Sequence, residues 1–427
     1  MMLKYKDYIP ELIYLILLIS TGLIPNYGAL DRIATQWFYL SVINTLGLSI
    51  FLFDKKYDKK NYKSTLQFKP LFFLILFTCW GLISSLYALN STEVIVKIIR
   101  WIQIPVSVFI ILLFVDNNRL DILKLITFFI TTILIIELYF SYSTYFDLTK
   151  ITTYNFSFAY LIKGATGNKN INAASILIKI PFVILLLYRS KPFIIKIFLG
   201  LIIAATSYLV LILSSRAAII SLIIIFLFLS FKFLSNLIIK NFKIKDLSFL
   251  IIVLSIALPI ILFSFKYSSI NSASIVNRVS TINSEDTSTQ QRLRYYNHSI
   301  TQILNNPIIG VGLGNWKIKS IDYDKEDILA YTIPYHTHND FLEIGTELGL
   351  IGLGLYLMIF IFPFLNIINY RTFLNPININ TLILLSGIVY FIDANLNFPH
   401  ARPVMQIPFI LILAFSFYQL KKPKENV

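Results

Sequence analysis

Long runs of apolar residues recur along the whole chain, and short polar segments separate them. A run of about 18 or more apolar residues matches the roughly 30 Å hydrocarbon core of a bilayer. Each run is predicted to be a helix, because open strands leave backbone polar groups unsatisfied in lipid. The pattern predicts twelve spans, near residues 9–25, 33–53, 68–89, 94–115, 122–142, 171–188, 193–213, 215–233, 247–265, 341–365, 379–395 and 403–420.

The composition agrees with this pattern. Hydrophobic residues make up 56% of the 427 residues and charged residues 14%, whereas soluble proteins carry about 25% charged residues. The chain is therefore predicted to be an all-α polytopic membrane protein. Its single cysteine, Cys79, excludes an intramolecular disulfide. The two halves of the chain differ, which disfavours transporters built from inverted repeats.

The basic residues predict the orientation in the membrane. The net charge of the chain is +15. Cytoplasmic loops of membrane proteins collect Lys and Arg, which explains this charge, so no nucleic-acid partner is expected. Outside the long loop 266–340, the side that carries the termini holds 21 basic residues and the other side 8. Both termini are therefore predicted to be cytoplasmic, and loops 143–170 and 266–340 extracytoplasmic. The first span lacks a cleavage site and is expected to remain as an anchor.

This layout divides the chain into four parts. Residues 1–265 are predicted to carry transmembrane helices 1–9, and 266–340 to form an extracytoplasmic cap loop of short helices. Residues 341–420 are predicted to carry helices 10–12, and 421–427 to be a cytoplasmic tail. The cap is the largest polar stretch of the chain and holds three of its four histidines.

Several cations are predicted on the outer side, at the ends of spans or in short loops: Lys97, Arg100, Lys163, Lys169, Arg216 and Arg402. Long basic side chains routinely reach from a helix end to lipid phosphates, which explains any one of these without a specific function. Arg216 differs, because it is the only charge in the apolar stretch 197–231. A charge placed inside a helical bundle is costly and favours a functional role.

Within the cap, residues 290–304 show helical spacing, with five apolar or aromatic residues on one face: Leu293, Tyr296, Ile300, Ile303 and Leu304. The following GVGLGNW is not a dinucleotide fingerprint, because Asn315 stands where the third glycine belongs. It is predicted to be a tight, flexible turn.

The string HTHNDFLE then leads into the tenth span. His336 and His338 are two residues apart and could not share a helix face, and no metal site is expected. Asp340 and Glu343 have the spacing of a capping box. Glu343 and Glu347 are interpreted as cap and dipole partners rather than catalytic acids. A neutral histidine just before this helix could accept a proton from a hydroxyl group.

These residues carry a family resemblance. The strings RLRYYNHSITQILNNPIIGVGLGNW and HNDFLEIGTELGLIGLGLYL resemble the signature region of the O-antigen ligase and O-antigen polymerase superfamily. GATGNKNINAASIL at 164–177 is similar to a further conserved segment of these proteins. Two differences are visible. Tyr296 replaces the family's usual tryptophan, and the large C-terminal repeat region of some protein-glycosylating relatives is absent, which leaves the acceptor open.

The resemblance implies a metal-independent, GT-C-like glycosyltransferase of the bacterial plasma membrane, with no cofactor. Its donor would be a glycan on undecaprenyl diphosphate, and its acceptor lipid A-core or a growing glycan. His338 aligns with the family's catalytic base, and Arg216 and Arg292 with the two arginines that hold the diphosphate. The remaining candidates are further diphosphate-binding residues and residues of the acceptor path: Arg294, Lys169 and Arg100 for the first role, His336 and His400 for the second.

Three functions stay open at this point. The first is an O-antigen ligase in lipopolysaccharide biosynthesis, and the second a polymerase of O-antigen or exopolysaccharide. Protein O-glycosylation would be a variant of the same chemistry. The third is a transporter of lipid-linked glycans, which charges scattered through the bundle would favour. The predicted clustering of cations at one face favours an enzyme.

Overall fold

The computed structural model describes residues 8–31, 33–53, 62, 65–117, 122–154, 156–239, 244–267, 287–327, 333–365, 367 and 377–421. Within these ranges the regular structure is entirely helical. Ten helices are long and apolar enough to cross a membrane, and two shorter apolar helices, Ile9–Leu23 and Pro403–Gln419, occupy the first and last predicted positions. The prediction of an all-α polytopic membrane protein is confirmed.

The helices that precede the cap are α1 (Ile9–Ser20), α2 (Ala34–Phe53), α4 (Lys69–Ile83), α5 (Ser91–Trp101), α6 (Gln103–Asn117), α7 (Ile122–Ile151), α8 (Phe156–Leu161), α9 (Lys169–Leu177), α10 (Ile180–Arg189), α11 (Phe193–Leu213), α12 (Arg216–Ile239) and α13 (Ile244–Lys266). The cap holds α15 (Thr287–Asn305) and α16 (Trp316–Asp324), and the chain ends with α17 (Asp340–Leu365), α19 (Ile379–Leu396) and α20 (Pro403–Lys421). Short 3₁₀ turns are η3 (Thr21–Leu23), η4 (Ser84–Leu86), η5 (Gly164–Thr166) and η6 (Pro399–Ala401).

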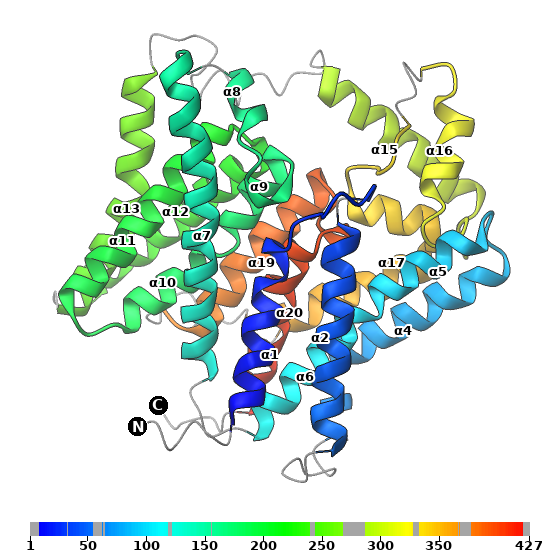
Figure 1. The fold of residues 1–427 in the computed structure, drawn as a ribbon, viewed down its shortest axis with the longest axis horizontal. Helices are drawn as coiled ribbons and strands as arrows, with labels where there is room; N and C mark the ends of the chain where they lie inside the picture. The colour runs from blue at the N-terminus through cyan, green and yellow to red at the C-terminus, as the bar shows by residue number, and fades with distance from the viewer. Residues whose placement is uncertain are drawn as a thin grey trace.

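The helices form a broad bundle with the cap at one end (Figure 1). In this view α7 and α10–α13 lie on the left, α1, α2, α19 and α20 in the middle, and α4, α5 and α17 on the right. The cap helices α15 and α16 lie at the top, whereas α1 begins and α20 ends at the bottom. The first and last helices thus place both chain ends on the same side of the bundle, as an even number of spans requires. The cytoplasmic location of the termini stays a prediction.

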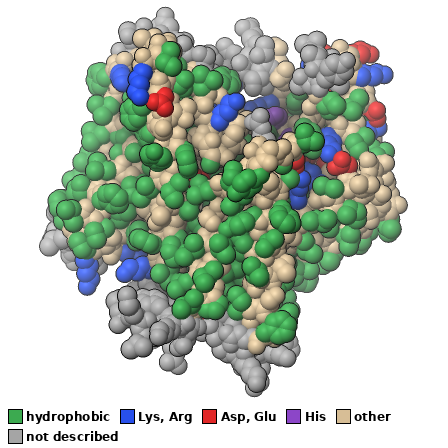
Figure 2. Space-filling view, viewed as in Figure 1, with side chains coloured by type: hydrophobic (Ala, Val, Ile, Leu, Met, Phe, Trp, Pro, Cys, Tyr) green, Lys and Arg blue, Asp and Glu red, His purple; other side chains and the backbone are tan. Residues whose placement is uncertain are grey.

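Apolar side chains cover much of the outer surface of the bundle, as a lipid-facing surface requires (Figure 2). Charged side chains gather near the upper and lower rims of the same view. One ion pair lies inside the bundle instead: the Lys179 ammonium is 2.7 Å from the Glu137 carboxylate, and both side chains are almost fully buried. Pairing of this kind offsets much of the cost of burying each charge.

The tenth span is broken at Gly349, whose φ of +66° interrupts α17. The break frees carbonyl groups that the glycine turn of the cap then satisfies. The amides of Val311 and Gly312 donate to the carbonyls of Thr346 and Glu347, at 3.1 and 2.8 Å. The turn is tight as predicted, but these hydrogen bonds attach it to the membrane helix, so the interpretation as a flexible turn is wrong.

Replacing Gly310 by alanine is expected to destabilise this junction. Gly310 has a φ of +69°, and an added Cβ would lie 2.5 Å from the carbonyl carbon of Glu347. Strain in this backbone region costs about 1–3 kcal/mol, so the unfolding temperature of the protein in detergent should fall. Gly354→Ala is the matched control, because its Cβ would meet no atom within 4 Å. Equal unfolding temperatures for the two variants would contradict this packing.

The cap helix α15 confirms the predicted helix at 290–304 but is rotated relative to the expected face. Leu293, Ile300 and Leu304 of the apolar face are 47%, 45% and 74% exposed. The buried side carries polar residues instead, with Ser299 fully buried and Gln302 1% exposed. Ser299 contacts α17 through its carbonyl, which accepts from the Thr346 hydroxyl at 3.4 Å. The rotation follows from this packing onto the polar start of α17.

Candidate functional site

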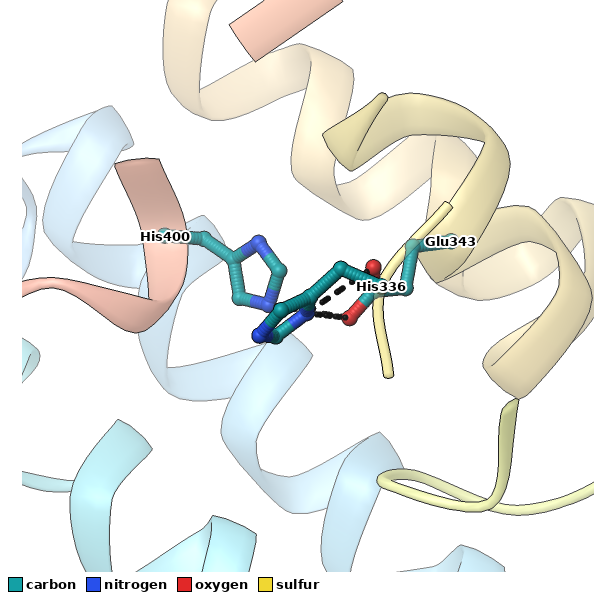
Figure 3. A group of neighbouring side chains, drawn as sticks. All are labelled: His336, Glu343 and His400. Carbon is teal, nitrogen blue, oxygen red and sulfur yellow. Dashed lines mark hydrogen bonds and ion pairs between the residues drawn. The ribbon is translucent and has the colours of Figure 1, made fainter. Parts of the chain in front are cut away.

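The loop that leads into α17, residues 333–339, packs against the connection between α19 and α20. Two histidines and a glutamate from three separate segments meet there (Figure 3). The Glu343 carboxylate lies 3.0 Å from Nδ1 of His336 and 3.4 Å from Nε2 of His400. It also accepts the amide of Thr337 at 3.0 Å. Glu343 therefore holds the histidine loop to the membrane helix.

His400 continues this chain of contacts to a second carboxylate. Its Nδ1 lies 2.6 Å from Oδ1 of Asp340, and its amide donates to Oδ2 of the same residue at 3.1 Å. Burial opposes the charged imidazolium, but Asp340 and Glu343 outweigh it and raise the pKa of His400 to about 10. Stacking on Trp101, with ring planes 9° apart, fixes the ring further. His400 is thus a positively charged link between two acids.

These contacts overturn the predicted capping box. Asn339, not Asp340, caps α17: its side-chain oxygen accepts the amides of Phe341 and Leu342, at 3.0 and 3.1 Å. Asp340 and Glu343 turn towards the histidines instead. Glu347 also has a different role, because its carboxylate accepts the amide of Trp316 at 3.1 Å and so holds the start of α16. The three acids connect segments rather than cap their own helix.

His338 has an unusual backbone. Its φ is +60°, a region that non-glycine residues rarely occupy and that is enriched at functional sites. Its carbonyl accepts the Tyr296 hydroxyl at 3.0 Å, and Phe398 packs edge-on against its ring at 5.2 Å. Burial, followed by the charge of Arg292, lowers the pKa of His338 to about 3. His338 is therefore neutral at physiological pH, as a proton acceptor must be.

A cavity of about 760 Å³ opens beside His336 and His338. Its lining includes His336, His338 and Phe398, together with three cations and one acid: Lys97, Arg100, Arg402 and Asp31. Figure 2 shows a histidine in a recess near the upper rim of the molecule, with basic side chains around it. A cavity that combines apolar walls with several cations, at one end of a membrane bundle, is suited to the headgroup of an anionic lipid.

The two arginines expected to hold diphosphate come from α12 and α15. Arg216 donates to the Thr289 hydroxyl at 2.8 Å. Thr289 and Arg292 are three residues apart on α15 and therefore lie on the same face. Arg292 acts on His338 through its charge. The fold thus brings the arginine of a distant membrane hairpin to the cap helix that carries the second arginine.

The other predicted diphosphate residues are placed differently. Arg100 lines the cavity and pairs with Asp31 at 2.6 Å. Arg294 pairs with Asp324 at 2.7 Å inside the cap, and Lys169 lies over the ring of Tyr160 at 3.7 Å. Neither Arg294 nor Lys169 is in the described lining of the cavity, and the same is true of Arg216 and Arg292. Of the two predicted acceptor-path residues, His336 reaches the cavity and His400 lies behind it.

His336, Glu343 and His400 offer nitrogen and oxygen atoms within 4.8 Å of one another, a set that could hold a metal ion. Sequence reasoning did not anticipate it, because His400 lies far along the chain. Both ring nitrogens of His400 face carboxylates, Nδ1 at 2.6 Å from Asp340 and Nε2 at 3.4 Å from Glu343, so a metal ion bound there would have to replace a proton of this ring. The hydrogen-bonded chain is therefore the arrangement that these residues favour.

Sequence reasoning did not single out Phe398, and it named Arg402 only as one of several cations on the outer side. Phe398 stacks on His336, with ring centroids 4.2 Å apart. The Arg402 guanidinium lies over the same Phe398 ring, 5.0 Å from its centroid. Both belong to the string NFPHARP, in which proline, histidine and arginine interrupt two apolar spans. This polar break between two apolar spans was the sequence signal that could have indicated site residues there.

Two comparisons with known proteins show which sequences this chain resembles. The sequence model of the O-antigen ligase family matches residues 199–357. A protein of Rickettsia prowazekii (strain Madrid E), named "Putative polysaccharide ligase", is 27% identical over 360 residues, covering 78% of this chain and 81% of the relative. The family match contains Arg216, Arg292 and His338 but ends before His400 and Arg402.

The fold and the cavity define a multi-pass, all-α membrane protein with a histidine and arginine site at one end of the bundle. Residues 199–357 match the O-antigen ligase family, and this match and the relative together support the O-antigen ligase superfamily. The family and the relative support a role in surface polysaccharide biosynthesis.

Proposed function

We propose that this protein transfers a glycan from undecaprenyl diphosphate to an acceptor hydroxyl at the outer face of the bacterial plasma membrane. The acceptor hydroxyl loses its proton to His338 as its oxygen bonds to the anomeric carbon of the glycan. The bond from that carbon to the diphosphate oxygen breaks, and the lipid diphosphate leaves with the electron pair. No metal or cofactor takes part in this scheme.

The observation that carries the proposal is the position of His338. It lines a cationic cavity, it is neutral, and it lies next to Arg292. A departing diphosphate gains negative charge, and fixed cations stabilise that charge most in the transition state. Arg216 and Arg292 are proposed to bind the diphosphate oxygens, since the planar guanidinium matches them bidentately. Arg100 reaches the cavity, but there it lies with Lys97 and Arg402 rather than with this pair.

A transfer assay with purified protein, EDTA and a lipid diphosphate-linked glycan tests the proposal. Lipid A-core and a second copy of the donor are offered as separate acceptors. Product on lipid A-core identifies an O-antigen ligase, which we favour. A longer glycan on the lipid carrier identifies a polymerase, for which the same cavity would serve. Donor that crosses a liposome bilayer without transfer would overturn the enzyme proposal, and loss of transfer in EDTA would overturn metal independence.

The pH dependence of transfer should change when the donor binds. His338 accepts a proton only when neutral, so activity falls as pH falls through its pKa. In the free enzyme the pKa of His338 is about 3. The value of kcat/KM should therefore stay near its maximum at pH 6.5, where an ordinary histidine titrates. Bound diphosphate offsets the charge of Arg292 and raises the pKa. We expect the acid limb of kcat at higher pH than that of kcat/KM.

The variant Arg292→Gln provides the comparison. It removes the charge that lowers the pKa of His338, so the acid limb of kcat/KM should move to higher pH. Parallel pH–rate profiles of the two proteins in kcat and kcat/KM provide the measurement. An acid limb near pH 6.5 in kcat/KM for both proteins would contradict this environment for His338.

A further inference from the structure

The described lining of the cavity carries a group of cations that is separate from Arg216 and Arg292 and belongs to elements other than α12 and α15. Lys97 and Arg100 belong to α5, and Arg402 lies just before α20. Asp31 is the one acidic residue in the lining as the structure describes it. This part of the wall therefore carries an excess of positive charge, and all three cations are at least partly buried.

These cations and the pair Arg216 and Arg292 belong to different surroundings. Arg216 contacts the start of α15, and the charge of Arg292 acts on His338 and Tyr296. Arg100 instead pairs with Asp31, and Asp31 in turn feels the charge of Arg402. The charge of Lys97 acts on His336. The two neighbouring histidines thus feel cations of different groups, His338 that of Arg292 and His336 that of Lys97.

Arg402, unlike Arg100, forms no ion pair among the described residues. Its Nε is buried and has no hydrogen-bond partner among the described residues. The guanidinium lies over the Phe398 ring at 5.0 Å, which leaves its edge for other partners. Burial lowers the pKa of Arg402; attraction to Asp31 opposes this, and repulsion from Arg100 adds a smaller lowering. Cations that crowd one another in a cavity favour an anion between them.

Arg402 also joins two cavities. A second cavity of about 300 Å³ is lined by Arg402 and by the turn Gly164–Gly167, and Ile33 borders both cavities. The turn belongs to the string GATGNKN. A ligand bound at Arg402 would therefore have space on both sides, which suits a long molecule rather than an isolated ion.

We propose that Lys97, Arg100 and Arg402 form an anion site for the acceptor, which binds a phosphate or carboxylate group of that molecule. The inference rests on the proposed transfer reaction and adds the chemical class of the acceptor. One diphosphate is contributed by the donor and is assigned to Arg216 and Arg292. A separate cationic group in the cavity that His338 lines fits a second anion, so the acceptor is an anionic glycolipid whose hydroxyl is directed to His338.

The variant Arg402→Gln tests this site with two forms of one acceptor. In the ligase case these are phosphorylated lipid A-core and the same material after dephosphorylation. If transfer occurs only to lipid-linked glycan, they are that glycan with and without its diphosphate lipid. We expect KM for the anionic acceptor to rise about tenfold or more, because hydrogen bonds to charged groups are strong. KM for the donor and transfer to the uncharged acceptor should change little.

Two further variants separate binding from folding. Arg402→Lys keeps the charge and should recover part of the affinity for the anionic acceptor. Lys163→Gln removes an exposed cation that lies outside the lining and should behave as wild type. Equal losses on both acceptor forms, or a rise in donor KM instead, would overturn the acceptor site. Absence of transfer by the wild-type protein would instead overturn the proposed function.

Discussion

Replacing His338 by alanine is expected to lower kcat for glycan transfer about 10²–10⁴-fold, the usual contribution of a general base. The reason is that the variant has no imidazole at this position to accept the proton of the acceptor hydroxyl. Because the side chain points into a cavity, its removal should leave insertion and folding intact. Initial rates and thermal unfolding of the purified variant provide the measurement.

Two other histidines serve as comparisons for this variant. His298 lies in the cap beside Asp324 and Tyr323, and His298→Gln should transfer at the wild-type rate. His336 is the alternative base, since Glu343 orients its ring as a carboxylate orients a catalytic histidine. A fully active His338→Ala together with an inactive His336→Ala would move the base to His336.

Replacing Arg216 or Arg292 by lysine is expected to reduce kcat/KM about tenfold to a hundredfold, although the charge is kept. Lysine is a point charge and cannot bond two phosphate oxygens through a planar fork. Hydrogen bonds to charged groups contribute about 1.5–3 kcal/mol, which sets this range. The loss should appear with every acceptor, because both arginines are assigned to the donor.

Arg189→Lys is the matched control for these two variants. Arg189 ends α10, at the opposite end of the bundle from the cap, and is expected to be neutral to this change. Steady-state kinetics with varied donor provide the measurement. Unchanged kinetics for both Arg216→Lys and Arg292→Lys would mean that these arginines only reach lipid phosphates.

The spans and the cap helix could be predicted because their signals are local. A long apolar run and the spacing of residues 290–304 each need only neighbouring residues to be recognised. The face of α15 could not be predicted in this way. Its buried side is set by α17 and the glycine turn, whose carbonyl and amide groups need polar partners, so Ser299 is buried and Leu304 is exposed.

The roles of the acids at the start of α17 were mispredicted for a related reason. Asp340 and Glu343 have the spacing of a capping box, and local spacing was the only information available. Their actual partner, His400, lies 60 residues beyond Asp340. The same holds for the cations of α5 and for Arg402, which looked like separate helix-end residues until the fold placed them in one cavity.

The most direct measurement of the central claim is the release of undecaprenyl diphosphate during transfer. Purified protein is incubated with lipid diphosphate-linked glycan, with and without acceptor, and the free lipid diphosphate and the glycosylated acceptor are quantified together. A glycosyltransferase of the proposed kind releases one lipid diphosphate for each glycan transferred, and His338→Ala releases almost none. Intact donor in every reaction, with or without acceptor, would contradict the proposal that this protein breaks the glycan–diphosphate bond.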